Sequence, residues 1–153
     1  MLLALVAAAQ AASPDRLAIL APLVGGCWRA EFSATVADTH CFEAVYNGAH
    51  VRDRHEVRDG GKTVYAGETV YSADGPDVVF TYFNSLGGVG HGKVRSAAGG
   101  IGFTGTMRSA PDQKPEAIGS EWRILDSDHY EVRTLVQGSA GTPHKPLTFT
   151  RVK

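Results

Sequence analysis

Apolar and polar residues alternate along most of the chain, with the two-residue period of half-buried β-strands. Short glycine-containing sequences such as Asn-Gly, Gly-Gly and Asp-Gly-Pro interrupt these runs at close intervals, and they are turn signals. The pattern predicts about ten strands. In chain order they are Cys27–Ala34, Thr39–Tyr46, Ala49–Arg58, Thr63–Ser72, Val78–Asn84, His91–Ser96, Ile101–Met107, Ser120–Leu125, Tyr130–Gln137 and Leu147–Val152.

Most of the predicted strands are joined by short turns, which favours an all-β fold in which each strand pairs with the next. We expect an up-and-down antiparallel barrel of about eight to ten strands, because closure leaves no exposed edge. A β-sandwich is the alternative. It needs long crossing connections, and only Ser109–Ala117 and Gly138–Pro146 are long enough.

The stretch with helical spacing is Leu17–Val24, in which leucines recur three residues apart. Ser13-Pro14-Asp15 is a helix-start signal, and Gly25-Gly26 ends the helix. We expect this short N-terminal helix to cap one barrel opening. Trp28, beside a glycine at the start of the first strand, is expected to plug the same end.

Composition and charge indicate the number of domains and the kinds of partner to expect. The chain has 153 residues, 43% of them hydrophobic, and 18 glycines, which fits one packed all-β domain over residues 13–153. The net charge is −1 and the basic residues are scattered, so we expect no nucleic-acid partner. The sequence leaves the oligomeric state open.

Residues 1–12 resemble a short secretory signal peptide, with Ala9-Gln10-Ala11 as its cleavage site. We therefore expect a periplasmic or secreted protein. No run approaches ~18 apolar residues, so no membrane-spanning helix is predicted. The alternative is a lipoprotein, because Val24-Gly25-Gly26-Cys27 resembles a lipoprotein cleavage box that would place the lipid on Cys27.

The Asn47-Gly48 turn sets the register of the two strands beside it. A two-residue loop there places His40 opposite His55 and Phe42 opposite Asp53. These four side chains share one face, which we predict to be the lumen, because the other face carries a complementary Glu–Arg pair. The predicted lumen face also carries Ala44, Tyr46, Val51 and Val57.

The next register depends on Gly60-Gly61. A two-residue turn brings Glu68 inside, opposite Asp53, whereas a three-residue turn brings Tyr65 and Thr69 inside instead. Both alternatives stay open from the sequence.

Buried carboxylates beside imidazoles are typical of functional sites, so His40, Asp53, His55 and Glu68 are the catalytic candidates. A hydrogen-bonded polar layer near one barrel end is the alternative interpretation. A metal site needs three ligands and His40 with His55 supplies two, so we predict no metal and no cofactor. His91, between two glycines, is a further candidate or a partly exposed strand residue.

The leading functional hypothesis is a binding or carrier protein for a small, largely apolar molecule in the barrel lumen. The alternatives are a lumen enzyme of isomerase or cyclase type with a histidine base, a haem or metal carrier, and a protein-interaction barrel with a filled lumen. The predicted ligand-binding residues are His40, Phe42, Asp53, His55, Phe80, Phe103 and Trp122.

Cys27 and Cys41 are predicted to form a disulfide. Trp28 points into the lumen, so Cys27 points out; His40 points in, so Cys41 points out as well. The two cysteines lie on adjacent antiparallel strands, and an exported protein meets oxidising conditions. Reduced thiols are the alternative.

Gly26-x-Trp28 after a short helix, followed by a barrel that ends in a strand with Arg151, resembles the calycin superfamily, which includes lipocalins and fatty-acid-binding proteins. The resemblance implies that Arg151 packs over Trp28. Ten strands are nearer to the fatty-acid-binding or nitrobindin-type barrels than to eight-stranded lipocalins. The chain is therefore identified as lipocalin-like, of a divergent bacterial branch.

Overall fold

The structure is a computed structural model that describes residues 15–137 and 145–153. Apart from one short 3₁₀ helix, the regular secondary structure of the described chain is all β-strand. Its ten strands are β1 (Cys27–Glu31), β2 (Val36–Val45), β3 (His50–Asp59), β4 (Lys62–Asp74), β5 (Asp77–Asn84), β6 (Val89–Ala97), β7 (Gly100–Arg108), β8 (Glu116–Ile124), β9 (His129–Gln137) and β10 (Leu147–Arg151). The predicted signal segment 1–12 and residues 138–144 of the second long loop lie outside the described residues.

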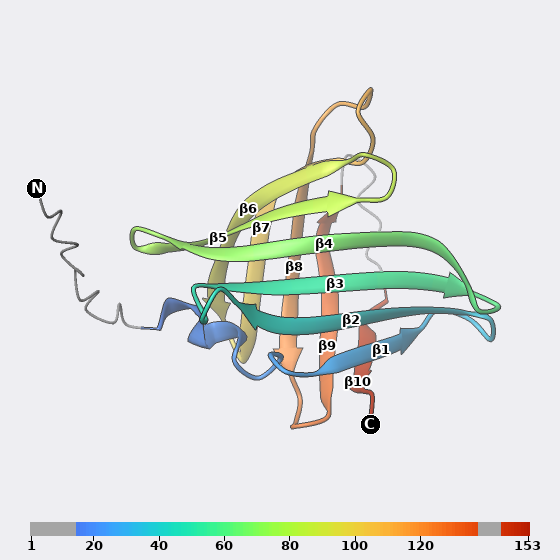
Figure 1. Cartoon of the computed structure of the whole chain (residues 1–153), viewed down its shortest axis with the longest axis horizontal. Helices are drawn as coiled ribbons and strands as arrows, with labels where there is room; N and C mark the ends of the chain where they lie inside the picture. Colours follow the sequence, from blue (N-terminus) through green and yellow to red (C-terminus); the bar gives the residue numbers. More distant parts are fainter. Residues whose placement is uncertain (1–14, 138–144) are drawn as a thin grey trace, which may run out of the picture.

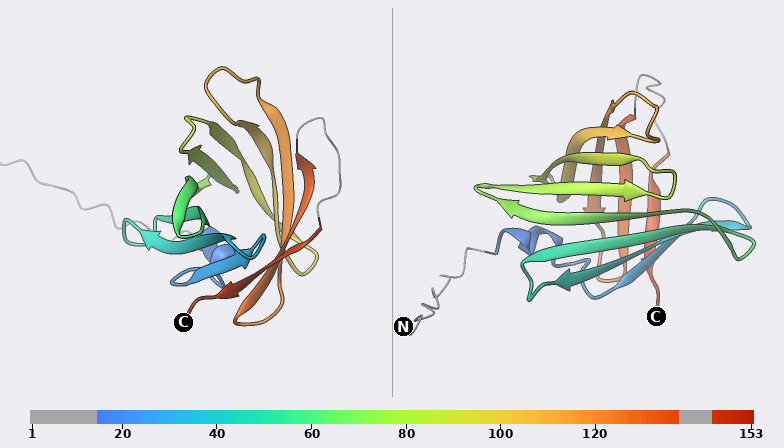
Figure 2. Two further views of the ribbon diagram at one scale, coloured as in Figure 1. Left: turned by 90° about the vertical axis from the view of Figure 1, so that its right-hand side faces the viewer. Right: turned by 45° about the horizontal axis from the view of Figure 1, so that its top comes forward.

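Each strand pairs antiparallel with the next, and β1 pairs with β10, so the sheet closes into a barrel. In Figure 1, β2, β3 and β4 cross in front of β8, β9 and β10 at a steep angle, and Figure 2 shows the same sheet from two further sides. The predicted up-and-down barrel is confirmed, and the sandwich alternative is wrong. Within the described residues, no helix is long and apolar enough to cross a bilayer.

The register between β2 and β3 is the predicted one, but the predicted two-residue loop is wrong, because the turn spans four residues, Tyr46–Ala49. His40 pairs with His55 and Phe42 with Asp53. The prediction that Tyr46 lines the lumen is wrong, because the strand ends at Val45 and the Tyr46 side chain is 80% exposed. The Tyr46 backbone is left-handed, with a φ of 53°, and belongs to the turn. Ala44, also predicted to face the lumen, is exposed near this end of the barrel.

Between β3 and β4 the structure combines the two alternatives. The turn at Gly60-Gly61 has two residues, but a bulge then leaves Val64 unpaired and shifts the register by one. Tyr65 and Thr69 therefore face the lumen, whereas Glu68 lies on the outer face. The prediction of an inward Glu68 is wrong, because a bulge inside the strand, rather than the turn, decides the register.

The predicted helix over Leu17–Val24 is shorter than expected. The chain forms a 3₁₀ helix, η1 (Arg16–Leu20), followed by turns as far as Gly25. Leu17, Leu20 and Leu23 are nonetheless buried, and η1 lies against β3, β4 and β5. The apolar spacing thus correctly identified the side chains that cap the barrel, although they are carried by a 3₁₀ turn.

Trp28 lies at the capped end and is 1% exposed. Its indole N–H donates to the Leu23 carbonyl at 3.2 Å, and the Arg151 guanidinium lies 4.3 Å from the centre of its ring. Trp28 and Arg151 are also direct partners of β1 and β10. Gly26 leaves room for this contact, because a Cβ there would lie 2.5 Å from Arg151 Nη1. The predicted packing of Arg151 over Trp28 is confirmed.

Cys27 and Cys41 form a disulfide, as predicted. They are direct partners of β1 and β2, with their Cα atoms 4.0 Å apart. Because the Cys27 sulfur is in this bond, it is not free to carry a lipid, which counts against the lipoprotein alternative.

The buried core packs against η1 and the turns that follow it. Aromatic rings from opposite strands meet there, such as Trp28 against Tyr130 at 5.2 Å and Tyr130 against Phe149 at 4.9 Å between ring centres. Phe42, Phe80 and Phe103 belong to the same buried cluster. Other side chains packed against this cluster, among them Trp122 and Ile118, are only partly buried.

Candidate functional site

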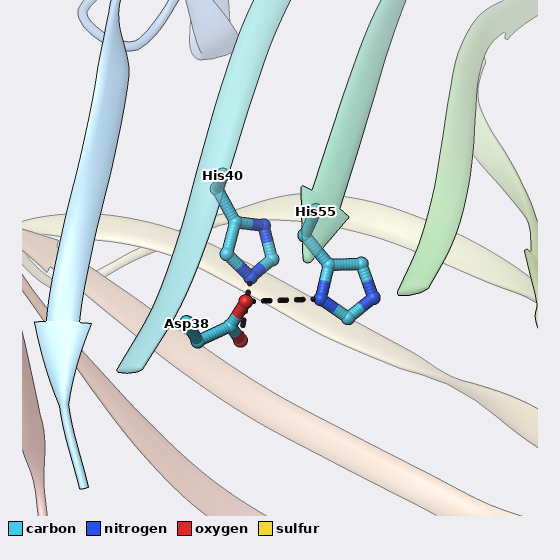
Figure 3. Close-up of side chains that lie close together, drawn as sticks. All are labelled: Asp38, His40 and His55. Atoms are coloured by element: carbon cyan, nitrogen blue, oxygen red, sulfur yellow. Dashed lines mark hydrogen bonds and ion pairs between the residues drawn. The ribbon is translucent and has the colours of Figure 1, made fainter. Parts of the chain in front are cut away.

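The lumen face changes from apolar to polar beyond this aromatic core. Two strands supply most of the polar groups: Asp38 and His40 come from β2, and Asp53 and His55 from β3. Figure 3 shows the Asp38 carboxylate between the two imidazole rings. Tyr65 of β4 and Tyr82 of β5 complete what we call the polar cluster: Asp38, His40, Asp53, His55, Tyr65 and Tyr82.

His40 lies between two carboxylates. Its Nδ1 donates to Asp53 Oδ2 at 2.7 Å, and its Nε2 donates to Asp38 Oδ2 at 3.2 Å. Its side chain is 15% exposed, and that of Asp53 is 2% exposed. Since carboxylates only accept hydrogen bonds, both ring nitrogens carry a proton and His40 is an imidazolium in this arrangement.

His55 continues the chain of contacts. Its Nδ1 donates to the other oxygen of Asp38, at 3.2 Å, and its Nε2 lies 3.0 Å from the Tyr82 hydroxyl. Tyr82 in turn lies 2.7 Å from the Tyr65 hydroxyl. Gly67 leaves space for these groups, because a Cβ there would lie 2.6 Å from His55 Nε2 and 2.5 Å from the Tyr82 oxygen.

Strand geometry explains why the cluster forms. Residues two apart on a strand share a face, which places Asp38 beside His40 and Asp53 beside His55. The β2–β3 ladder then brings the two pairs together, because His40 is the direct partner of His55. The four groups are therefore held by continuous backbone pairing rather than by loops.

The cluster shifts the titration of its members. Burial by itself lowers the pKa of His40, but the carboxylates of Asp53 and Asp38 outweigh it and raise the pKa to about 10. Burial by itself raises the pKa of Asp38, yet hydrogen bonds from His40 and His55 hold the pKa of this carboxyl well below its usual range. Burial and the neighbouring Tyr65 raise the pKa of Tyr82, so its hydroxyl keeps its proton.

Two buried polar atoms near the cluster lack a hydrogen-bond partner among the described residues. They are Asp53 Oδ1 and the Tyr130 hydroxyl. An unpaired buried polar atom destabilises a fold by about 1–3 kcal/mol, so stability alone does not account for this carboxyl group.

The predicted ligand-binding residues separate into two groups. His40, Asp53 and His55 come together in the polar cluster, as predicted for the face they share. The four aromatic residues form its floor: His40 lies 6.1 Å from Phe42 and 6.3 Å from Trp122 between ring centres, and Phe103 packs on Trp122 and Phe80.

Two other candidates lie elsewhere. Glu68 is on the outer face opposite Arg54, and His91 is exposed on β6. Asp38 and Tyr82 were not predicted from the sequence as site residues. Asp38 was missed because the second strand was predicted to begin at Thr39, although Asp-x-His is the spacing that places two side chains on one face of a strand.

A groove of about 680 Å³ runs over the outer face of β1–β5. Most of its lining residues point outward by strand alternation, including Arg29, Arg54 and Glu68, and the disulfide residue Cys41 also lines it. His55 and Gly67 of the lumen face contribute to the lining as well. The polar cluster therefore borders the groove only at its β3–β4 side.

Comparison with known proteins supports the fold. No protein-family model matches the chain, and no curated protein matches it in sequence. Among solved structures, the chain is similar to the crystal structure of Rv2717c from M. tuberculosis, with 18% identity and a TM-score of 0.59. The match covers 92% of this chain and 99% of that one. At this identity the likeness shows the fold alone.

Proposed function

We propose that this barrel binds a small, largely apolar molecule in the half of its lumen that lies beyond the aromatic core. The observation that carries the proposal is the polar cluster, which lines the lumen above a floor of aromatic side chains. A barrel with two carboxyl groups and two imidazoles buried in its lumen is less stable than one with apolar side chains at the same positions. A binding role gives a reason for that cost.

The chemistry of the partly exposed side chains indicates the kind of ligand. Trp122, Ile118, Val132 and Leu147 pack against the core and are only partly buried, so they offer apolar surface. Tyr65 and Tyr82 are partly buried in the same way and offer hydroxyl groups. A molecule with an apolar body and one hydrogen-bonding group matches both features.

Binding agrees better with the cluster than acid–base catalysis by His40. The two flanking carboxylates raise the pKa of His40 to about 10, despite the opposing effect of burial, so it is protonated at neutral pH and is not a general base. His40 is therefore not suited to be the base of the isomerase or cyclase alternative.

The proposal extends to compartment and family. The disulfide, together with the predicted signal peptide at 1–12, supports a periplasmic or secreted protein whose single domain covers 13–153. The capped barrel with Arg151 over Trp28 supports membership of the lipocalin-like calycins.

Titration with anilinonaphthalene sulfonate, a fluorescent probe with an apolar body and one polar group, tests the proposal. The metal-stripped protein is expected to enhance the probe's fluorescence with one site per chain. Tyr82→Phe is expected to weaken binding roughly five-fold, the effect of losing one hydrogen bond worth about 1 kcal/mol. Tyr46→Phe is the matched control, because Tyr46 is exposed in a turn.

Near-ultraviolet circular dichroism must show the same folded state for all three proteins, because the probe also binds partly unfolded chains. Absence of probe binding by the folded wild-type protein would refute the proposal. So would an equal loss of affinity in Tyr46→Phe and Tyr82→Phe, since this would place the probe outside the lumen.

A further inference from the structure

We propose that Asp38, His40 and His55 hold one divalent transition-metal ion, of the kind represented by Zn²⁺ or Fe²⁺, at the lumen face of β2 and β3. The inference uses the same polar cluster as the proposed function, but it does not require that an organic ligand binds. Three observations carry it: the spacing of the donor atoms, the partners of the two histidines, and the formal charge of the site.

The donor atoms already lie at the spacing of metal ligands. The two Asp38 oxygens are each 3.2 Å from one imidazole nitrogen, Nε2 of His40 and Nδ1 of His55. The candidate donor atoms of the three residues all lie within 4.8 Å of one another. Ligands bound at ~2.0–2.1 Å in a tetrahedral site are about 3.3 Å apart, so an ion between them needs only small side-chain movements.

Each histidine also has the outer partner that a metal ligand usually has. The nitrogen of His40 that faces away from Asp38 donates to Asp53 at 2.7 Å, and the corresponding nitrogen of His55 lies 3.0 Å from the Tyr82 hydroxyl. A carboxylate or hydroxyl on the second nitrogen fixes the tautomer and orientation of a metal-bound imidazole. Figure 3 shows the remaining nitrogens of both rings turned toward the Asp38 carboxylate.

The formal charges fit a divalent cation. Asp38 and Asp53 together carry two negative charges in a nearly buried site, and their side chains are 10% and 2% exposed. When His40 releases its Nε2 proton to bind the ion, one divalent cation balances both carboxylates. Asp53 Oδ1, which has no partner among the described residues, is part of this carboxyl pair. Two histidines and one carboxylate make a ligand set that leaves coordination positions open for water or a lumen ligand.

A titration of the full chain, purified without a histidine tag and stripped with a chelator, tests the site. Co²⁺ should bind one ion per chain and develop visible d–d absorption, and Zn²⁺ should displace it. His55→Gln removes a ligand and should abolish the absorption. Asp53→Asn removes the negative charge of the outer partner of His40, and Tyr82→Phe removes the outer hydroxyl of His55; each should weaken binding roughly 10–100-fold. His91→Gln, an exposed histidine, is the matched control and should bind like the wild type.

Circular dichroism shows whether each variant folds. If His55→Gln does not fold, Tyr82→Phe still tests the site, because it keeps the aromatic ring. Folded wild-type protein without Co²⁺ binding would overturn the inference, as would binding that persists in His55→Gln or falls equally in His91→Gln. Metal binding without probe binding would support this site while refuting the proposed function. Probe binding to the stripped protein without metal binding would do the reverse.

Discussion

Removing the Cys27–Cys41 disulfide should lower the stability of the barrel by about 3 kcal/mol. The two cysteines are 14 residues apart in sequence, so the bond closes a loop of roughly 15 residues. In the chain-entropy model, the unfolded chain regains the freedom of that loop when the bond is removed, which gives the ~3 kcal/mol. For a domain of this size, the expected fall in melting temperature is roughly 6–12 °C.

The measurement compares the wild-type protein with a Cys27→Ala/Cys41→Ala variant in urea and thermal unfolding. The wild type treated with a phosphine reductant should match the variant, because both lack the bond. The same reductant is the control on the variant, which it should leave unchanged. Intact mass before and after alkylation should detect no free thiol in the wild type. Two alkylated cysteines in the untreated protein, or equal stability of the variant and the wild type, would refute the reasoning.

Removing the disulfide should affect the stability of the fold but not the metal affinity of the polar cluster. The bond joins β1 to β2, whereas the polar cluster is held by the β2–β3 ladder, which has backbone pairs from Val36–Asp59 to Val45–His50. Loss of the bond should therefore lower stability and change Co²⁺ affinity by less than about three-fold, within the additivity error of independent sites.

Three further outcomes are expected. Gly26→Ala should lower the melting temperature, because a Cβ there lies 2.5 Å from the Arg151 guanidinium and must displace it; thermal unfolding measures this. Gly67→Ala should lower the free energy of Co²⁺ binding more than the free energy of unfolding, because its Cβ would lie 2.6 Å from His55 Nε2. Calorimetry measures the first quantity and urea unfolding the second. In chelator-treated protein, the pKa of His40 is raised to about 10 in the folded state, so its contribution to the free energy of unfolding is fully present below pH 6.5 and is lost as the pH rises to about 10. Urea unfolding at several pH values should show this free energy falling over that range, and falling less steeply in His40→Gln.

The sequence predicted the fold well because the relevant signals are local. Asn47-Gly48 alone set the register that places His40 opposite His55, and the alternation around Trp28 correctly placed both cysteines on one face. The departures occur at strand ends, in turns and at the bulge of β4. Tyr46 follows the alternation of its strand but belongs to a left-handed turn, and strand periodicity carries no information about where pairing stops.

The site was predicted in part, for a different reason. His40, Asp53 and His55 were brought together by one hairpin, whose register a sequence can define. Tyr82 reaches the cluster from β5, so its position depends on every register between β3 and β5. Asp38 was missed because the second strand was predicted to begin a few residues too late, and that single error removed the third ligand of the proposed metal site.

The bulge at Val64 determines which residues of β4 reach the polar cluster. If the register from the Gly60-Gly61 turn continued unbroken, Glu68 would face Asp53 in the lumen and Ala66 would face His55. The first change would add a third carboxyl group to a nearly buried site, and the second would place a methyl group beside the imidazole. The bulge substitutes Gly67 at the second position, where even a Cβ would collide with His55.

The shift of one residue therefore changes both charge and space in the lumen. It sends Glu68 to the outer face, opposite Arg54, and turns the Tyr65 hydroxyl inward to within 2.7 Å of Tyr82. Bulges commonly lie beside functional sites because they re-aim side chains without breaking the sheet. Here the strands β2 and β3 supply the charged groups at a register set by the four-residue turn Tyr46–Ala49. The irregular strand β4 gives these groups the room and the hydroxyl that a regular strand of the same sequence would deny them.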